Sequence, residues 1–314
     1  MKVLVTGGAG FIGSHLAGRL AEEGHQLVVL DDLSSGKRDQ VPGAASFYQM
    51  DVASRWTERV VAREKPEAVC HLAAQISVSR SMQDPLFDAH VNILGSLGLL
   101  EACRRHGVRR FVFVSTGGAM YGDAETIPTP ESYPAAPVSA YGASKLGFEH
   151  YLHVFHSVDG LSYAAMRLAN VYGPRQDPRG EAGVVAIFSQ ALLEGRTPVI
   201  NGDGLQTRDY VYVGDVVNAL VAALTSDAVG AFNVGTGLET DVNTLYARLR
   251  EAAGSEVEAT HGAPRPGEQR RSCLDATRAR ETFGWQPRFI LEEGLRETVE
   301  YFRGQVALGG AAAS

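Results

Sequence analysis

The amino-acid sequence predicts an α/β fold in which a doubly wound parallel sheet is joined to a smaller C-terminal α/β lobe. Short apolar, β-branched runs alternate with helical stretches through the first half of the 314 residues. These runs are apolar on both faces, as strands buried between two layers of helices must be. A glycine-rich turn, "TGGAGFIG", follows the first run directly, and such sheets bind nucleotides at that place.

The alternation can be followed element by element. Apolar runs bounded by turn residues predict strands, and apolar residues at helical spacing predict helices. The expected strands cover residues 2–6, 26–31, 46–51, 68–73, 109–115 and 161–169. The expected helices cover residues 14–24, 57–65, 87–107 and 139–156. We expect right-handed crossovers between these strands.

The pattern changes after about Pro174, where helical segments mix with short strands. Helices are expected over residues 184–194, 214–224, 243–253, 277–283 and 291–303. We therefore predict a nucleotide-binding domain over residues 1–174 and a substrate lobe over 175–303. Residues 304–314 lack any periodic pattern and are expected to be a flexible tail. The runs "TRDYVYVGDV" and "FNVGTG" could return strands to the main sheet.

Composition narrows the class of protein. The net charge is −7, with 45% hydrophobic and 21% charged residues, and no basic cluster suggests a nucleic-acid partner. The three cysteines, Cys70, Cys103 and Cys273, lie far apart in the sequence, which disfavours disulfides, and neither they nor the histidines show metal-ligand spacing. We see neither an export signal nor a run of about 18 apolar residues that could span a membrane. We expect a cytoplasmic protein without a metal ion or a membrane partner.

The strongest local signal is the glycine-rich turn. Gly8, Gly10 and Gly13 satisfy G-x-G-x-x-G, and Gly7 satisfies an overlapping pattern. The turn follows a strand and opens a helix, so its backbone N–H groups and the helix dipole can hold a pyrophosphate. This context favours a Rossmann-type dinucleotide site over a plain glycine turn.

Acidic residues end the next two expected strands. Asp31 ends the second strand, where a carboxylate can accept both hydroxyls of a ribose and would repel a 2′-phosphate. The sequence therefore predicts NAD rather than NADP. Asp32 begins a loop that could wrap the adenosine, and Asp51 could contact the adenine. A role in turns alone stays open for all three aspartates.

A second motif, "YGASK", places Tyr141 and Lys145 on one face of a helix. The strand before it ends in Ser115-Thr116, at the sheet edge where the cofactor is expected. A free tyrosine has a pKa near ~10 and is a poor base at neutral pH. Because an ammonium and a positively charged nicotinamide ring favour the phenolate, we expect the pKa of Tyr141 to fall.

With these motifs in order, the sequence resembles the extended short-chain dehydrogenase/reductase family of nucleotide-sugar enzymes, in particular its UDP-glucose 4-epimerase-like branch. The resemblance runs from residue 2 to about residue 303. The matching stretches are "TGGAGFIGSH", "DDLSSG", "HLAA", "STGGAMYG", "YGASK", "RLANVYGPRQ", "GDGLQTRDYVYVGDV", "FNVGTG" and "GWQP". It implies tightly held NAD in the N-terminal domain and a UDP-sugar on the C-terminal lobe.

The resemblance also implies roles for individual residues. Thr116, Tyr141 and Lys145 would form the catalytic group. Asn170, Arg208 and Arg265 would bind the sugar nucleotide with Thr116 and Tyr141. The implied NAD contacts are Gly7, Gly10, Phe11, Ile12, Asp31, Asp32, Ser35, Gly36, Asp51, Val52, Leu72, Ala73, Ala74, Asn92, Ser115, Tyr141 and Lys145. Asp32 departs from the asparagine common at its place. Turn or surface roles stay open for Asn170, Arg208 and Arg265.

Gly117 and Gly118 bear on the type of reaction. Related 4,6-dehydratases usually carry Asp-Glu directly after the threonine, and related UDP-glucuronate decarboxylases a Glu. Glycines cannot perform elimination chemistry, whereas epimerisation needs only hydride transfer, one base and one hydrogen-bond donor. The resemblance therefore favours a 4-epimerase in which the C4 hydride leaves, the 4-keto sugar turns and the hydride returns. We expect the two glycines to let the backbone turn and the sugar swing.

Several alternatives stay open. The sugar could be glucose or galactose, an N-acetylhexosamine or a glucuronate; a small residue near Ser272 would leave room for a C2 substituent. A dehydratase, decarboxylase or reductase of the same family, and a non-catalytic NAD-binding regulator, are further alternatives. The resemblance implies a homodimer through the helices that carry Asn92 and Tyr141. The apolar residues considered for that interface are Leu97, Leu99, Leu100, Phe148, Tyr151 and Leu152, which could instead cover the sheet.

Overall fold

A seven-stranded parallel sheet forms the centre of the molecule, in the order β11-β6-β5-β4-β1-β2-β3. The computed structural model describes residues 1–179, 183–265 and 269–312. The strands are β1 (Lys2–Thr6), β2 (Gln26–Asp31), β3 (Ser46–Gln49), β4 (Ala68–His71), β5 (Arg110–Thr116), β6 (Ser162–Leu168) and β11 (Gly230–Val234). The predicted doubly wound α/β fold is confirmed, and the "FNVGTG" run does return a strand to the sheet.

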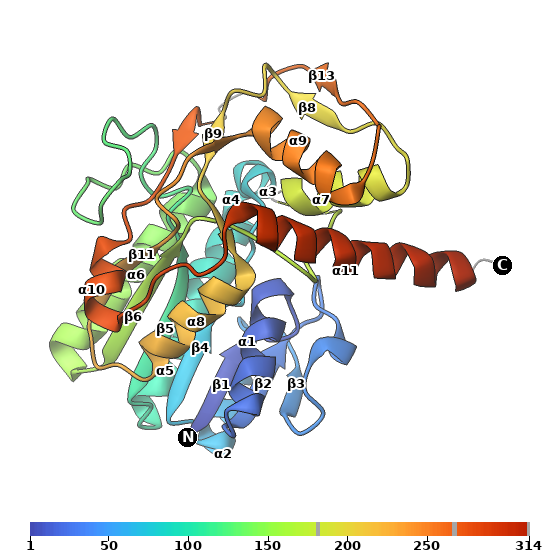
Figure 1. Ribbon diagram of the computed structural model, residues 1–314. Coiled ribbons are helices and arrows are strands. Elements are labelled where there is room, and N and C mark those ends of the chain that lie inside the picture. The colour runs from blue at the N-terminus through green and yellow to red at the C-terminus, as the bar shows by residue number, and fades with distance from the viewer. Residues whose placement is uncertain (180–182, 266–268, 313–314) are drawn as a thin grey trace.

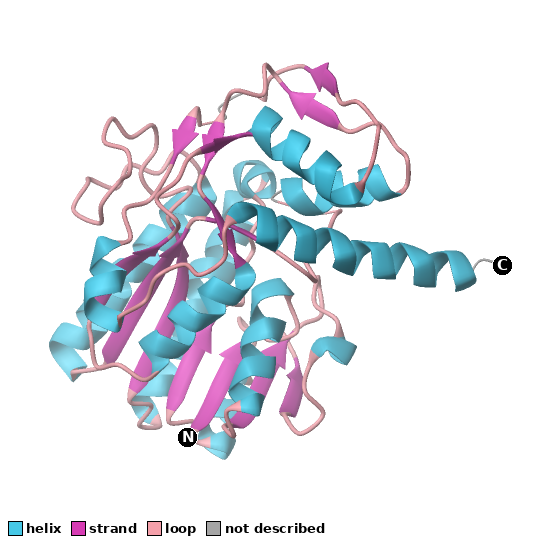
Figure 2. Cartoon of the chain, viewed as in Figure 1, coloured by secondary structure: helices cyan, strands magenta, loops and turns pink. Residues whose placement is uncertain are grey.

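Helices cover both faces of this sheet (Figures 1 and 2). Helices α1 (Phe11–Glu22), α8 (Val213–Leu224) and α10 (Thr277–Phe283) pack on one face, and α2 (Thr57–Glu64), α5 (Ser96–Arg105) and α6 (Ala140–Asp159) on the other. Successive residues of β1 point to opposite faces: Val3 and Val5 join the first core and Leu4 the second. This is why the sequence of the strand is apolar throughout.

The long helix predicted over residues 87–107 is built from several segments. After α3 (Val78–Gln83), α4 (Pro85–Ala89) begins at the N-cap Asp84 and runs into a π-helical segment, η2 (His90–Gly95), and then into α5. Gly95 packs closely on Ala53, and an added Cβ would lie 3.1 Å from the Ala53 Cβ. The irregular turn thus brings the helix close to the loop after β3.

The C-terminal lobe has its own apolar core (Figure 1). Helices α7 (Val184–Leu193), α9 (Val242–Ala253) and α11 (Leu291–Ala312) enclose it. Short sheets pair β7 (Asn170–Tyr172) with β10 (Tyr210–Tyr212), β8 (Val199–Asn201) with β13 (Thr260–Gly262), and β9 (Thr207–Arg208) with both β12 (Thr240–Asp241) and β14 (Arg271–Ser272). The "TRDYVYVGDV" run therefore stays outside the seven-stranded sheet.

The last helix is longer than its sequence pattern predicts. We expected it to end at residue 303 and residues 304–314 to form a flexible tail, but α11 continues to Ala312; the last two residues lie outside the described part of the chain. Figure 1 shows the end of α11 extending past the body of the lobe. Within the described ranges, no helix combines the length and apolar character needed to cross a membrane.

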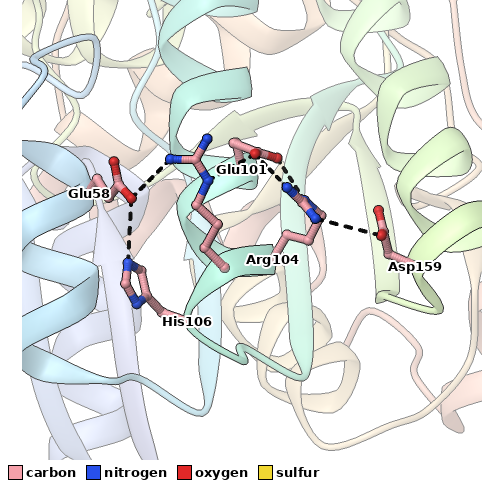
Figure 3. Close-up of polar contacts among 6 residues, drawn as sticks. Glu58, Glu101, Arg104, His106 and Asp159 are labelled. Carbon is pink, nitrogen blue, oxygen red and sulfur yellow. Dashed lines mark hydrogen bonds and ion pairs between the residues drawn. The ribbon is translucent and has the colours of Figure 1, made fainter.

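An exposed ion-pair network joins the ends of three helices away from the glycine-rich turn (Figure 3). Arg104 and Arg105, in the last turn of α5, both bind Glu101. Arg105 also binds Glu58 of α2 at 3.1 Å, and Arg104 approaches Asp159 at the end of α6. The two arginines thus place positive charge at the C-terminus of α5, which the helix dipole favours.

Replacing Leu4 by alanine should test the second core. The side chain is fully buried, so the Leu4→Ala variant should lose about 2–5 kcal/mol of unfolding free energy, measured by urea titration. Glu101→Gln is the control, because an exposed ion pair contributes little to stability. A Leu4→Ala protein as stable as the Glu101→Gln protein would contradict the assignment of Leu4 to the core.

Candidate functional site

A cavity of about 1160 Å³ opens at the carboxyl ends of the central strands, between the sheet and the C-terminal lobe. Strand order reverses between β1 and β4, and parallel sheets bind ligands at such a crevice. Most residues predicted for the site line this one cavity. They are Gly7, Gly10, Phe11, Ile12, Asp31, Asp32, Ser35, Asp51, Val52, Leu72, Ala73, Ala74, Ser115, Thr116, Tyr141, Lys145, Asn170, Arg208 and Arg265.

The glycine-rich turn forms a tightly packed cradle. Gly7 has φ +68° and lies against the chain after β4; an added Cβ would sit 2.7 Å from the Ala73 nitrogen. A Cβ on Gly13 would overlap the carbonyl of Gly7, which fixes how closely α1 approaches the turn. Helix α1 begins at Gly10 without a side-chain cap. Its first N–H groups are therefore suited to an anion in the cavity.

Asp31 lies at the end of β2 and is 6% exposed. Its carboxylate accepts hydrogen bonds from the N–H groups of Ala9 at 2.9 Å and Leu33 at 2.8 Å. Burial raises the pKa of Asp31, and these two hydrogen bonds act in the opposite direction. The carboxylate thus joins the second strand to the glycine-rich turn and still lines the cavity.

Three other predicted cofactor residues have structural roles. Asp32 accepts hydrogen bonds from the backbone and hydroxyl of Ser34. Asp51 accepts one from the backbone of Ala53 at 2.8 Å. Both aspartates therefore shape turns as well as lining the cavity. Gly36 packs on the glycine-rich turn, and an added Cβ would lie 2.8 Å from the carbonyl carbon of Ala9.

The end of β5 and the start of α6 bring the predicted catalytic group together. Thr116 and Tyr141 both line the cavity, and the side chain of Thr116 acts to lower the pKa of the Tyr141 phenol. Lys145, one helical turn after Tyr141, is 3% exposed and donates to the carbonyl of Val114 at 3.0 Å. Its Nζ lies 5.9 Å from the centre of the Tyr141 ring.

The protein chain by itself does not lower the pKa of Tyr141, and the predicted fall with a nicotinamide ring in place stays a prediction. Burial raises the pKa of Tyr141 to about 12, and the negative charge of Asp88 adds to the rise against the hydrogen bond from Thr116. Burial also lowers the pKa of Lys145 to about 8, although the carboxylates of Asp88 and Glu149 oppose this. Removal from water is thus the largest effect on both groups, and the Lys145 ammonium donates to the Val114 carbonyl.

Asn92 lies behind the cavity and is 2% exposed. Its side chain accepts from the N–H of Gln75 and donates to the carbonyl of Gln75, Asp88 and Ser144, at 2.9–3.2 Å. Asn92 therefore fixes the loop after β4 and joins it to α6. We predicted that Asn92 contacts the cofactor. In the structure, its side chain holds the residues that form the cavity wall.

The residues predicted to bind the sugar nucleotide lie on the lobe side. Asn170 begins β7 and its N–H donates to the Asp209 carbonyl, and Arg208 lies in β9. The carboxylate of Asp209 is buried and accepts from Thr236, Gly237 and Leu274, so it fixes the strand that carries Arg208. Arg265 is exposed at the cavity, and the three residues after it lie outside the described part of the chain.

Gly117 is tightly packed, contrary to our expectation that it lets the sugar swing. A Cβ at Gly117 would overlap the side chain of Leu274, a buried residue of the C-terminal segment. Gly118 lines the cavity, and its Cβ would meet the Asn170 amide oxygen at 3.5 Å, an ordinary contact. Close packing against Leu274 thus requires a residue without a side chain at position 117. The spacing of residues in the sequence could not indicate this contact.

Sequence reasoning also missed part of the rim. Ile76, Val78 and Met82 line the cavity while being 44–61% exposed. Apolar side chains in the polar stretch "QISVSRSMQ" were the available signal. Ser272, considered for the size of the sugar site, lies instead buried in β14, in register with Arg208.

Comparison with known proteins agrees with this geometry. Residues 3–235 match the NAD dependent epimerase/dehydratase family. The chain is 50% identical to the UDP-glucose 4-epimerase of Mycolicibacterium smegmatis, over 96% of this chain and 99% of that protein. A crystal structure of Thermotoga maritima UDP-glucose 4-epimerase with UDP-glucose superposes with a TM-score of 0.96 at 49% identity, covering 98% of this chain and all of that one.

A second crystal structure, of Thermus thermophilus UDP-glucose 4-epimerase in complex with NAD, has a TM-score of 0.93 at 47% identity, covering 97% of this chain and 99% of that one. The match extends over both the sheet and the lobe, so the cavity between them is part of what the proteins share. The resemblance drawn from the motifs is thereby confirmed, and the chain belongs to the NAD-dependent epimerase/dehydratase family of extended short-chain dehydrogenases/reductases.

Proposed function

We propose that this protein is an NAD-dependent 4-epimerase of a UDP-sugar, with UDP-glucose and UDP-galactose as the interconverted pair. The observation that carries the proposal is a single cavity that contains a dinucleotide cradle, a Thr116–Tyr141–Lys145 group and lobe residues able to bind phosphates. The similar proteins of Mycolicibacterium smegmatis, Thermotoga maritima and Thermus thermophilus are UDP-glucose 4-epimerases, which supports the choice of reaction.

The residues of the cradle fit NAD. The uncapped start of α1 suits the pyrophosphate, and the buried Asp31 carboxylate suits a ribose diol and repels a 2′-phosphate. When bound, NAD supplies the acceptor that takes the C4 hydride of the sugar and later returns it. Lys145, a member of the catalytic group, lines the cavity, and so does Ser115, which directly precedes Thr116.

The chain's own groups would handle the proton. Tyr141 must first lose its own proton, which the Lys145 ammonium and the positive charge of a bound nicotinamide ring would favour. The phenolate then takes the proton from the sugar O4–H and later returns it. Thr116, which lines the same cavity as Tyr141, steadies the sugar oxygen as it becomes a carbonyl. The Lys145 ammonium supplies positive charge beneath the phenol and can bind a ribose hydroxyl. Turning of the 4-keto sugar before the hydride returns would invert C4.

The environment of Gly117 favours epimerisation over elimination. A dehydratase needs an acid and a base beside the sugar, and Leu274 fills the space that a side chain at residue 117 would take. This chain therefore lacks, at this position, the extra acid or base that a 4,6-dehydratase or a decarboxylase usually carries. The choice among glucose, N-acetylhexosamine and glucuronate as the preferred sugar stays a prediction.

A panel of UDP-sugars incubated without added cofactor tests the proposed reaction. UDP-glucose and UDP-galactose should interconvert, and Tyr141→Phe should lose at least about 100-fold in kcat because the proton acceptor is gone. The variant should still purify with NAD. Products are identified by chromatography; a dehydrated or decarboxylated product, or an active Tyr141→Phe protein, would contradict the proposal.

Two glycines of α1 allow a matched test of the cradle. Gly13→Ala places a methyl group against the Gly7 carbonyl and should weaken NAD binding strongly, as measured by calorimetry. Gly18→Ala, in the same helix, meets no atom within 4 Å and should bind NAD normally. It should also be more stable by about 0.5–1 kcal/mol, because alanine favours the helix. Equal NAD affinities in the two variants would refute the cradle.

We also propose that the protein is a homodimer. Among the residues first considered for the interface, Leu99, Leu100, Phe148 and Leu152 are fully buried in the core beneath the helices. Tyr151 is exposed, as are Leu86 and Leu94 on α4 and η2 and Val154 and Val158 on α6. These elements pack against one another, so the exposed side chains supply an apolar face for a second copy.

Placing a charge in this face should separate the subunits. Leu94→Arg should shift the protein from dimer to monomer in sedimentation experiments, because an unpaired guanidinium would be buried at the interface. Ile290→Arg, at an equally exposed apolar residue before α11, should leave the dimer intact. A wild-type monomer, or a dimer insensitive to Leu94→Arg, would rule out this face.

We place the enzyme in the cytoplasm, also as a proposal. Cys70, Cys103 and Cys273 are all free and buried. Burial raises the pKa of each thiol, so the reactive thiolate form is disfavoured. Free thiols suit a reducing compartment.

A further inference from the structure

A third ionisable residue continues the row formed by Tyr141 and Lys145 on α6. Glu149 follows Lys145 by four residues, which places it one helical turn further along the same face. Its side chain is 7% exposed, and no role in the reaction described above requires it. A buried carboxylate must be paired, and its partners show what it does.

Glu149 is bound on two sides. Arg167 of β6, 8% exposed, donates from Nη2 to Oε2 at 2.6 Å and from Nε to both carboxylate oxygens at 3.1 Å. The hydroxyl of Ser115, at the end of β5, donates to Oε1 at 2.5 Å. The carboxylate therefore bridges the helix that carries Tyr141 and Lys145 to the two strands beneath the cavity.

We propose that Glu149, held by Arg167, is a positioning residue of the catalytic edge. It fixes the Ser115 hydroxyl so that its oxygen accepts a hydrogen bond from the ligand, and it supplies a fixed negative charge one turn behind Lys145. The proposal concerns how the catalytic group is held, and the consequence for turnover rests on the proposed epimerase function.

The first effect follows from the inventory of hydrogen bonds. A serine hydroxyl has one donor and two acceptor sites. Because the Ser115 proton is directed to Glu149, the hydroxyl oxygen of this cavity-lining residue can act only as an acceptor toward a ligand. The group facing Ser115 must then be a donor, such as an amide NH2 or a sugar hydroxyl. A ligand carbonyl at this place would be disfavoured.

The second effect follows from the charges around Lys145. Asp88 of α4 and Glu149 both favour the ammonium, while burial disfavours it. His71 of β4 also faces Lys145, but burial lowers its pKa so far that the ring is neutral. Tyr141, on the same helix, is protonated over the physiological range. Removing the charge of Glu149 leaves Asp88 as the remaining carboxylate that favours the ammonium.

The pair is also part of a longer network that fixes the loop above the site. Arg167 donates from Nη1 to the Tyr121 hydroxyl at 2.8 Å, and Tyr121 donates to Asn233 of β11 at 2.9 Å. Asn233 in turn donates to the carbonyls of Thr129 and Asp275. A buried ion pair adds little net stability compared with apolar residues, so such an arrangement is better explained by the geometry it imposes.

Lysine titration provides a direct test that does not depend on turnover. The chain has four lysines, Lys2, Lys37, Lys65 and Lys145, so 13C-lysine labelling gives few signals, and replacing the other three by arginine identifies Lys145. In the protein without added ligand, the pKa of Lys145 should be lower in Glu149→Gln than in the wild type. In Glu149→Asp, which keeps the charge, it should stay near the wild-type value. If the pKa of Lys145 is unchanged or higher in Glu149→Gln, the proposal that the Glu149 charge stabilises the Lys145 ammonium is overturned.

Kinetics then test the positioning of Ser115. A glutamine at residue 149 that gives its oxygen to Arg167 turns its NH2 toward Ser115 and reverses that hydrogen bond. Glu149→Gln should therefore lower kcat with UDP-galactose by about tenfold or more, with KM changed less than about twofold. Because the pKa of Lys145 is lowered, the fall of kcat at alkaline pH should begin at lower pH. A folded variant with wild-type kcat and pH profile would overturn the proposal.

Two further variants separate function from folding. Glu101→Gln makes the same change in the exposed network of Figure 3 and should leave kcat and the pH profile unchanged. If Glu149→Gln does not fold because Arg167 is left unpaired, the double variant Glu149→Gln/Arg167→Gln removes both charges. It should regain thermal stability without regaining kcat; wild-type kcat in it would overturn the proposal. A wild type without epimerase activity would refute the proposed function, and the lysine titration would still decide this inference.

Discussion

Removal of the Lys145 ammonium from water is the constraint on which the polar structure around the cavity depends. Lys145 is almost fully buried, and burial lowers its pKa to about 8. Carboxylates on two elements, Asp88 and Glu149, offset that cost. Each carboxylate needs partners of its own: Asp88 is bound by Gln75 and Asn92, and Glu149 by Ser115 and Arg167. One buried charge thus accounts for much of the hydrogen bonding behind the site, because an uncompensated ion in protein costs several kcal/mol.

The C-terminal lobe takes part in building the site as well as closing it. Asp209, beside Arg208, receives hydrogen bonds from the loop after β11 and from the N–H of Leu274. Leu274 in turn packs on Gly117 at the end of β5. The strand that presents Thr116 is therefore held from above by a residue more than 150 positions later in the chain. Leu274 therefore occupies the space beside Gly117 that an acidic or basic side chain would need.

Many features of the fold and of the candidate site could be predicted from the order of residues, because they depend on interactions between residues close in sequence. The glycines of the first turn, Asp31 at a strand end, and the spacing of Tyr141 and Lys145 on one helical face predict a dinucleotide site and a proton-transfer group. The first six strands of the sheet and the boundaries of α9 and α10 followed from periodicity within a residue or two. In α11 the pattern failed, since glycine and alanine near the C-terminus leave no amphipathic signal although the backbone is helical to Ala312.

The sequence by itself therefore determined the fold class, the cofactor and the family, whose signals lie within short segments of chain. Only the tertiary structure showed which side chains surround the predicted catalytic residues. It placed Leu274 on Gly117, Asn92 behind the cavity wall and Ser272 in a buried strand, and it raised the pKa of Tyr141 where sequence reasoning expected a fall. The physical reason is that burial, packing and electrostatic effects depend on neighbours far apart in the chain, whereas helical spacing and strand-end motifs depend on neighbours in sequence.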